Sequence, residues 1–78
     1  MQELIDFIAR SLVDDPIQVH VSQQKRGLNV DIRLQVSKED MGRVIGKSGR
    51  VANSMRILLR VAAAREGKRA SLDIVEPR

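Results

Sequence analysis

The chain has 78 residues, of which 42% are hydrophobic and 31% charged, and it contains no cysteine. This composition is typical of a small globular domain, and it excludes a disulfide scaffold, a thiolate metal site and a disordered chain. The N-terminus is amphipathic and acidic, and no stretch approaches the roughly 20 apolar residues of a membrane span. We therefore expect a protein of a bacterial-type cytoplasm with no membrane partner.

The basic side chains are concentrated in the second half of the chain. The formal net charge is +4, but residues 1–42 carry −2, and residues 43–69 carry eight basic side chains against one acid, a net of +7. Charge segregated in this way produces a positive field over one region, for which a polyanion is the natural partner. A solvated helix face rich in arginine would give the same count, so charge alone leaves both interpretations open.

The first half of the chain predicts a helix and two strands. Apolar residues at helical spacing predict an amphipathic helix over residues 2–13, which ends before Pro16 because the residue preceding a proline avoids the helical region. Alternating apolar and polar residues predict strands over 17–22 and 28–36, joined into a hairpin by a turn at 24–27. The apolar positions are Leu4, Ile5, Ile8 and Leu12 in the helix, Ile17, Val19 and Val21 in the first strand, and Leu28, Val30, Ile32, Leu34 and Val36 in the second.

A short helix is predicted next. Ser37 is a suitable N-cap, with Asp40 three residues later as its partner in a capping box. Residues 41–45 then carry one apolar stripe, and the segment Gly46–Gly49 interrupts the helix.

A long helix and a third strand complete the predicted elements. The helix covers residues 50–66 with Gly67 as its C-cap, and alternation over residues 70–74 predicts a strand that Pro77 stops. The order is therefore α-β-β-α-α-β. Because each strand is polar on one face, we predict one two-layer α+β domain over residues 1–78, with three helices covering one face of a three-stranded sheet.

The segment GRVIGKSGR at residues 42–50 invites comparison with the phosphate loop of nucleotide hydrolases. A Walker A motif has the form G-x-x-x-x-G-K-[ST] and follows a strand. Here only three residues separate Gly42 from Gly46, two of them are β-branched, and no apolar strand ending in a metal-binding Asp follows. The sequence therefore argues against nucleotide hydrolysis.

The same segment suits a loop that binds a nucleic-acid backbone. Gly46 and Gly49 allow a tight reversal between two helices with exposed backbone N–H groups, and the start of the next helix favours anions. Lys47, with Arg43 and Arg50 beside the loop, adds positive charge. A KH loop clamps about four nucleotides of backbone in this manner. The alternative is an inert helix–helix turn, which would need neither the second glycine nor the concentrated charge.

The sequence V-I-G-K-S-G at residues 44–49 resembles the signature loop of KH domains. The predicted element order is similar to the prokaryotic, type II arrangement. The motif G-R-V-I-G-K-S-G-R at residues 42–50, in a chain that consists of this domain, resembles the small bacterial KhpA family of single-KH RNA-binding proteins. The resemblance covers the whole chain.

The resemblance implies a binding site for single-stranded RNA at this loop. It implies that Lys47 and Ser48 lie against the RNA backbone, and that an adjacent groove lined by aliphatic side chains holds the bases. The residues expected to bind RNA are Arg43, Val44, Ile45, Gly46, Lys47, Ser48, Gly49 and Arg50, with Ile32 or Leu34 joining from the second strand. The aliphatic members would also be core residues. The resemblance further implies an RNA chaperone or post-transcriptional regulator that acts with a larger KH-domain partner of the KhpB type.

Other classes of function fit the residues less well. The rival hypothesis is a protein-interaction adaptor that no longer binds RNA, although such KH domains commonly lose the glycines or basic residues kept here. Single-stranded DNA is a third option, because the loop alone does not inspect the 2′-hydroxyl. For catalysis, His20 is alone on a polar strand face, and Asp14 and Asp15 adjoin the helix-ending Pro16. We therefore expect a non-enzyme that uses neither a metal nor a cofactor.

The apolar residues of the long helix suggest self-association. Phe7 is the only aromatic residue, so the base stacking worth about 1–3 kcal/mol per base in other single-strand binders is absent and one copy should bind weakly. At about 100° per residue, Ile57 and Val61 fall nearly opposite the core stripe of the helix, and Leu58 falls on a flank. One interpretation is that these are ordinary exposed aliphatic residues, which are common on protein surfaces. A homodimer or a docked partner would cover this strip and would raise avidity by combining two loops in one particle.

Overall fold

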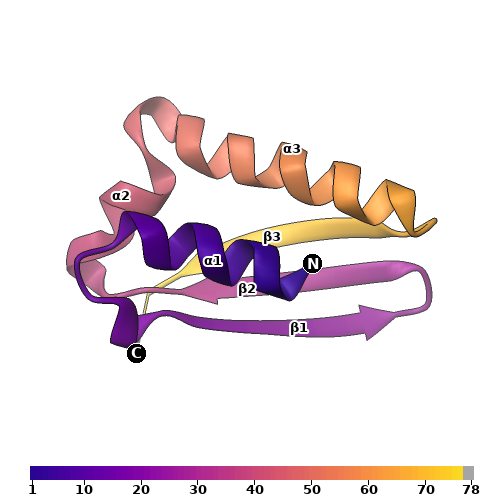
Figure 1. Ribbon diagram of the computed structural model, residues 1–78, viewed down its shortest axis with the longest axis horizontal. Helices are drawn as coiled ribbons and strands as arrows, with labels where there is room; N and C mark the ends of the chain where they lie inside the picture. The colour runs from indigo at the N-terminus through magenta and orange to yellow at the C-terminus, as the bar shows by residue number, and fades with distance from the viewer. Residues whose placement is uncertain (77–78) are drawn as a thin grey trace.

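The computed structural model describes residues 1–76. It is an α+β fold in which helices cover one face of a three-stranded sheet (Figure 1). The helices are α1 (Gln2–Leu12), α2 (Met41–Ile45) and α3 (Arg50–Arg65), and the strands are β1 (His20–Arg26), β2 (Asn29–Gln35) and β3 (Arg69–Val75). The predicted order α-β-β-α-α-β is confirmed, whereas the strand stop predicted at Pro77 lies outside the described residues.

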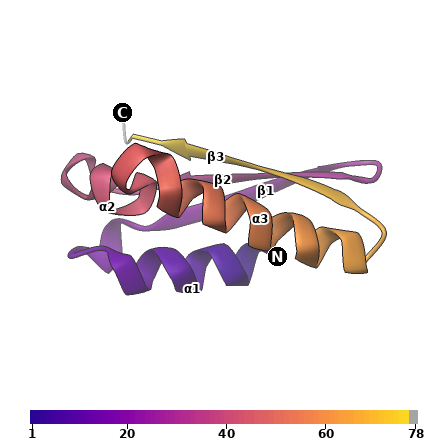
Figure 2. The same ribbon diagram turned by 90° about the horizontal axis from the view of Figure 1, so that it is seen from above.

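The sheet has the order β1-β2-β3, so β2 is central and β1 and β3 are its edges. β1 pairs antiparallel with β2, and β3 pairs parallel with β2. The parallel pairing requires a crossover, and this connection contains α2, the glycine loop and α3. α1 packs on β1 and β2 and α3 packs on β3, while α2 lies at one end against both helices (Figure 2). None of the helices described within residues 1–76 is both long and apolar enough to cross a membrane.

The core lies between the helices and the apolar face of the sheet. β2 alternates as predicted, with Val30, Ile32 and Leu34 buried. The buried residues that pack against this strand are Ile5 and Ala9 of α1, Val44 of α2, Met55 and Leu59 of α3, and Leu72 of β3. The opposite face of the sheet is left polar.

The strand predicted at residues 17–22 begins later than expected. Residues Pro16–Gln18 form a 3-10 turn, and Ile17 is 81% exposed instead of facing the core. Pro16 occupies the start of this turn, where its fixed φ is favourable, and Arg10 of α1 donates to the carbonyl oxygens of Pro16 and Val19. The turn therefore delays the strand until His20.

The predicted turn at residues 24–27 is also displaced. β1 continues through Arg26, which pairs with Asn29 and leaves a two-residue loop of Gly27 and Leu28. Gly27 has φ +61°, a conformation that a two-residue hairpin needs and that glycine adopts without steric strain. Leu28 is exposed in the loop and is not part of the strand.

The predicted capping box at Ser37 does not form. The Ser37 hydroxyl donates to Asp40 Oδ2 at 3.0 Å and caps no backbone N–H, and a 3-10 turn over Lys38–Asp40 precedes α2. The reason is that the Asp40 carboxylate is turned toward the chain after α1, where it accepts from the backbone N–H groups of Asp14 and Asp15.

Candidate nucleic-acid interface

The glycine loop joins α2 to α3 through one 3-10 turn, Lys47–Gly49, and projects from the end of the molecule (Figure 1). Three of its four residues have positive φ: Gly46 at +77°, Ser48 at +57° and Gly49 at +76°. Lys47 and Ser48 are exposed at its tip. The two residues that the resemblance to KH domains implies to lie against an RNA backbone are therefore accessible.

The two glycines serve the loop for different physical reasons. A Cβ added at Gly46 would lie 2.4 Å from Val51 Cγ2 and 2.9 Å from the Val51 backbone N, so no larger residue fits where α3 turns back against the loop. A Cβ at Gly49 would meet open space, and only the left-handed backbone favours glycine there.

Ser48 is the only non-glycine residue with positive φ among those described. The left-handed conformation is unfavourable by about 1–2 kcal/mol for an ordinary L-residue. Strain of this kind persists where the surrounding structure holds the backbone in place, and it is found at binding sites more than elsewhere. Nothing in the sequence indicated that Ser48 would adopt it.

The other predicted RNA-binding residues divide into exposed and buried groups. Arg50 is exposed at the first position of α3, and Ile45 is 36% exposed beside the loop. Val44 is fully buried in the core, as are Ile32 and Leu34 of β2, so these three side chains do not reach the surface.

Arg43 is held by acidic neighbours. Its Nη2 lies 2.8 Å from Asp14 Oδ2, and its Nε lies 3.4 Å from Asp40 Oδ1. The guanidinium therefore already has two carboxylate partners, and it contributes less free positive charge to the loop than the sequence suggested.

Asp40 connects this arrangement to the rest of the fold. Burial raises the pKa of its carboxyl, but the N–H groups of Asp14 and Asp15, the Ser37 hydroxyl and the charge of Arg43 outweigh burial, so the pKa is lowered from its ordinary value of 3.8. The ionised carboxylate thereby holds the chain after α1 against the start of α2, the helix that leads into the loop.

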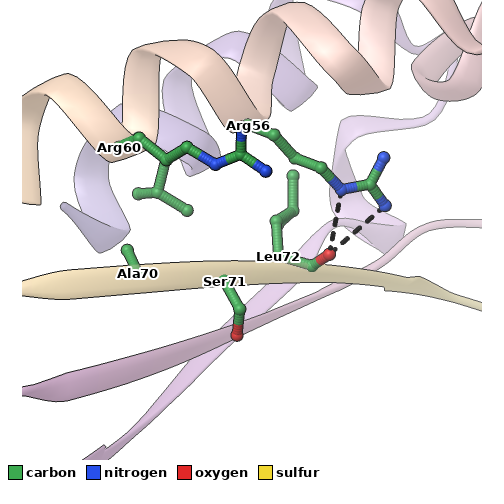
Figure 3. A pocket seen from close by; sticks show the side chains of 6 residues that line it. Arg56, Arg60, Ala70, Ser71 and Leu72 are labelled. Atoms are coloured by element: carbon green, nitrogen blue, oxygen red, sulfur yellow. Dashed lines mark hydrogen bonds between the residues drawn. The ribbon is translucent and has the colours of Figure 1, made fainter.

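A groove between α3 and β3 was not predicted. One cavity of about 160 Å³ is lined by Arg56, Leu59, Arg60, Ala70, Ser71 and Leu72 (Figure 3). A second hollow shares Arg60 and Ala70 with it and extends toward Lys68 and Arg69. Two arginines spaced four apart beside the core stripe of α3 were a signal of a basic helix edge. Finding the groove also required knowing that β3 is an edge strand beneath that helix.

Most of the basic side chains in residues 43–69 carry charge that no carboxylate neutralises. Within residues 1–76, ion pairs engage only Arg43 and Lys68 of this group, and the Lys68 Nζ is 3.9 Å from Glu66 Oε1. The cations without a carboxylate partner among the described residues are Lys47, Arg50, Arg56, Arg60, Arg65 and Arg69. The predicted segregation of charge is therefore present along α3 and beside the groove.

The apolar strip predicted on α3 is exposed, but its members face different neighbours. Ile57 and Val61, 57% and 50% exposed, form an outward ridge on the helix. Leu58, 49% exposed, instead lines a hollow between α1 and α3 together with Ile8 and Leu12.

The chain is similar in sequence to known KH-domain proteins over almost its whole length. The model of the family described as KhpA/KhpB, KH domain matches residues 2–74. A protein of Clostridium perfringens named RNA-binding protein KhpA is 44% identical over 75 residues, which are 96% of this chain and 100% of the relative. Relatives of the same name from Halalkalibacterium halodurans and Chlamydia trachomatis are 42% and 37% identical, covering 97% and 100% of this chain and all of each relative. The fold, the loop and these full-length matches together show that the chain belongs to the KhpA/KhpB family of KH-domain proteins.

Proposed function

We propose that this chain binds single-stranded RNA, gripping the backbone at Gly46–Gly49 and holding bases in the groove between α3 and β3. The observation that carries the proposal is the loop itself, in which Lys47 and Ser48 are exposed between two glycines of positive φ and beside cations without carboxylate partners. The relatives' printed name, RNA-binding protein KhpA, supports the same function. The activity is binding and not catalysis.

The positions of the basic side chains indicate which of them would contact phosphate groups of the RNA. Lys47 and Arg50 are at the loop, and Arg60 lines the groove. Each of them can neutralise a phosphate without first breaking an ion pair among the described residues. Affinity then depends on backbone contacts and shallow apolar packing, because the chain has no aromatic platform at the groove.

The cellular role that we propose is that of a cytoplasmic RNA chaperone or post-transcriptional regulator. The ridge of Ile57 and Val61 supports association with a second copy or with a larger KH-domain protein of the KhpB type. Either arrangement would combine two RNA loops and offset the weakness of one.

The test replaces Lys47 and Ser48 together by Asp. We expect affinity for a short single-stranded RNA to fall by more than about tenfold, since charge-assisted contacts to phosphate are lost and repulsion is added. Asp tolerates the left-handed conformation better than most residues, so circular dichroism should show an intact fold. The matched control is Ser22→Asp with Lys25→Asp, which makes the same charge change in exposed residues of β1.

Salt dependence provides the second readout of this experiment. For about three phosphate contacts by Lys47, Arg50 and Arg60, the slope of log K against log salt should be near −2, at about −0.7 per contact on single strands. The loop variant should show a shallower slope and the β1 control an unchanged one. Equal binding by the folded loop variant would refute the clamp, whereas a folded wild type that binds no RNA would favour the adaptor hypothesis. Equal affinity for DNA of the same sequence would mean that the 2′-hydroxyl is not read.

A further inference from the structure

The Arg56 side chain lies across the groove between α3 and β3. Its Nε and Nη2 lie 3.4 and 3.3 Å from the carbonyl oxygen of Leu72 (Figure 3). Its Nη1 lies 3.5 Å from Asn53 Oδ1. It thus joins the helix to the strand over the cavity of about 160 Å³. Arg60, one turn further along α3, lines the same cavity but makes no hydrogen bond to any residue within 1–76.

The Leu72 carbonyl belongs to the free edge of the sheet. The Arg69 backbone N–H donates to the Leu28 carbonyl at 2.9 Å. The backbone N–H and C=O groups of Arg69 and of every second residue after it therefore point toward β2. The backbone groups of Leu72, which falls between them, therefore point away from β2. Arg56 supplies the partner that a neighbouring strand would otherwise provide.

The contact between Arg56 and Leu72 is easily exchanged. The distances from the Arg56 nitrogens to the Leu72 oxygen exceed the 2.7–3.2 Å that is usual for N–H···O hydrogen bonds, so both bonds are weak. No carboxylate pairs with Arg56 in the described part of the chain, in contrast to Arg43, which lies 2.8 Å from Asp14. The guanidinium can therefore leave the carbonyl without breaking an ion pair.

We propose that Arg56 is a latch on the groove, closed in the free protein and displaced when RNA binds. The inference rests on the RNA-binding function proposed above. A cavity of about 150 Å³ in another protein holds one benzene ring, so the Arg56 site is of a size to admit a single ring of a nucleobase. The entering base would donate its amino or imino hydrogen to the Leu72 carbonyl in place of Arg56, and the released guanidinium would turn away from the strand.

The latch predicts that a variant unable to hold the closed position binds RNA more tightly. Arg56→Lys keeps the charge, but a lysine ammonium lacks the planar fork that spans two parallel bonds to one acceptor. We expect affinity for a short single-stranded RNA to rise by about threefold or more, because the net contribution of one hydrogen bond corresponds to a factor of about two to ten. The salt slope should not change.

Arg33→Lys is the matched control, since it makes the same substitution at an exposed residue on the polar face of the sheet, outside the groove, and removes no hydrogen bond among residues 1–76. Its affinity should stay within about twofold of the wild type, because the charge is kept. In the wild type, the Nε–H resonance of Arg56 should shift when RNA is added. Thermal unfolding of both variants identifies any loss of stability.

The outcomes separate the latch from the function on which it rests. A fall in affinity for Arg56→Lys would mean that the arginine grips RNA directly, and the latch would be wrong. An unchanged affinity together with an unmoved Nε–H resonance would reduce Arg56 to a structural contact and also overturn it. If the wild type itself fails to bind RNA while folded, the proposed function fails, whatever the variants do.

Discussion

At the scale of single residues, the glycines differ in what the fold demands of them. Gly46 is enclosed by Val51 and has positive φ, whereas Gly49 has positive φ in open space. Gly42 has neither constraint, because it lies in α2 with no atom within 4 Å of an added Cβ. A sequence shows three similar glycines around one motif, but only the close approach of α3 distinguishes them.

Alanine substitutions at these positions should therefore change stability by different amounts. Gly46→Ala should destabilise the protein by about 2–4 kcal/mol, because overpacking adds to the left-handed penalty. Gly49→Ala should destabilise by about 1–2 kcal/mol through the left-handed penalty alone. Gly42→Ala should stabilise by about 0.5–1 kcal/mol, as in any open helical position.

Urea unfolding of the three variants measures this order directly. Equal losses for Gly46→Ala and Gly49→Ala would contradict the enclosure of Gly46 by Val51. RNA binding measured on the folded Gly42→Ala variant then shows whether an added methyl on α2 obstructs the ligand independently of stability.

At the scale of elements, the alternation of β2 and the apolar stripes of the helices predicted the order and the core. The start of β1 could not be predicted from alternation alone, because Pro16 and the hydrogen bonds from Arg10 stabilise a 3-10 turn in which Ile17 is exposed. The hairpin turn lies at Gly27 and Leu28 instead of the predicted residues 24–27, because two residues are enough to close it.

The candidate site was predictable only where it is local in sequence. The loop could be identified from its glycines and charges, since these are adjacent in the chain. Arg56 meets Leu72 across 16 residues, and Asp40 meets Asp14 across 26. Contacts of this kind depend on the strand order and on the crossover, which no local pattern encodes.

The contact between Asp40 and the chain after α1 predicts a pH-dependent stability. The folded pKa of Asp40 is lowered, so the stability it contributes is present above its ordinary pKa of 3.8 and is lost as pH falls through the lower folded value. Asp40→Asn should lower Tm by several degrees at neutral pH, and the difference from the wild type should shrink below about pH 4.

Glu39→Gln provides the control for this experiment, because Glu39 is the adjacent acid, exposed and without an ion pair among residues 1–76. Melting curves over a pH series should show little difference for this variant. If the difference in Tm between Asp40→Asn and the wild type stays constant down to acid pH, the charge of Asp40 does not stabilise the fold.

At the scale of the whole molecule, one face of α3 combines an apolar ridge with surrounding positive charge. Ile57 and Val61 are both at least half exposed, and contact of such surface with water is unfavourable by about 25 cal/mol per Å². Two-fold pairing of α3 with its copy is the simplest closed arrangement that covers the ridge. Arg50, Arg60 and Arg65 would then approach their copies, which limits affinity to the micromolar range or so, about −8 kcal/mol.

Sedimentation analysis should therefore reveal a monomer–dimer equilibrium that strengthens as salt rises, because salt screens the repulsion between the arginines. RNA binding by the same protein should weaken as salt rises, so the two equilibria should respond to salt in opposite directions. Val61→Asp should shift the chain to monomer, since it places a charge in the apolar contact. Ile17→Asp should not, although Ile17 is the more exposed aliphatic residue at 81%. A wild type that stays monomeric at high concentration and high salt, or an equal effect of the two substitutions, would show that the ridge of α3 does not pair with its copy.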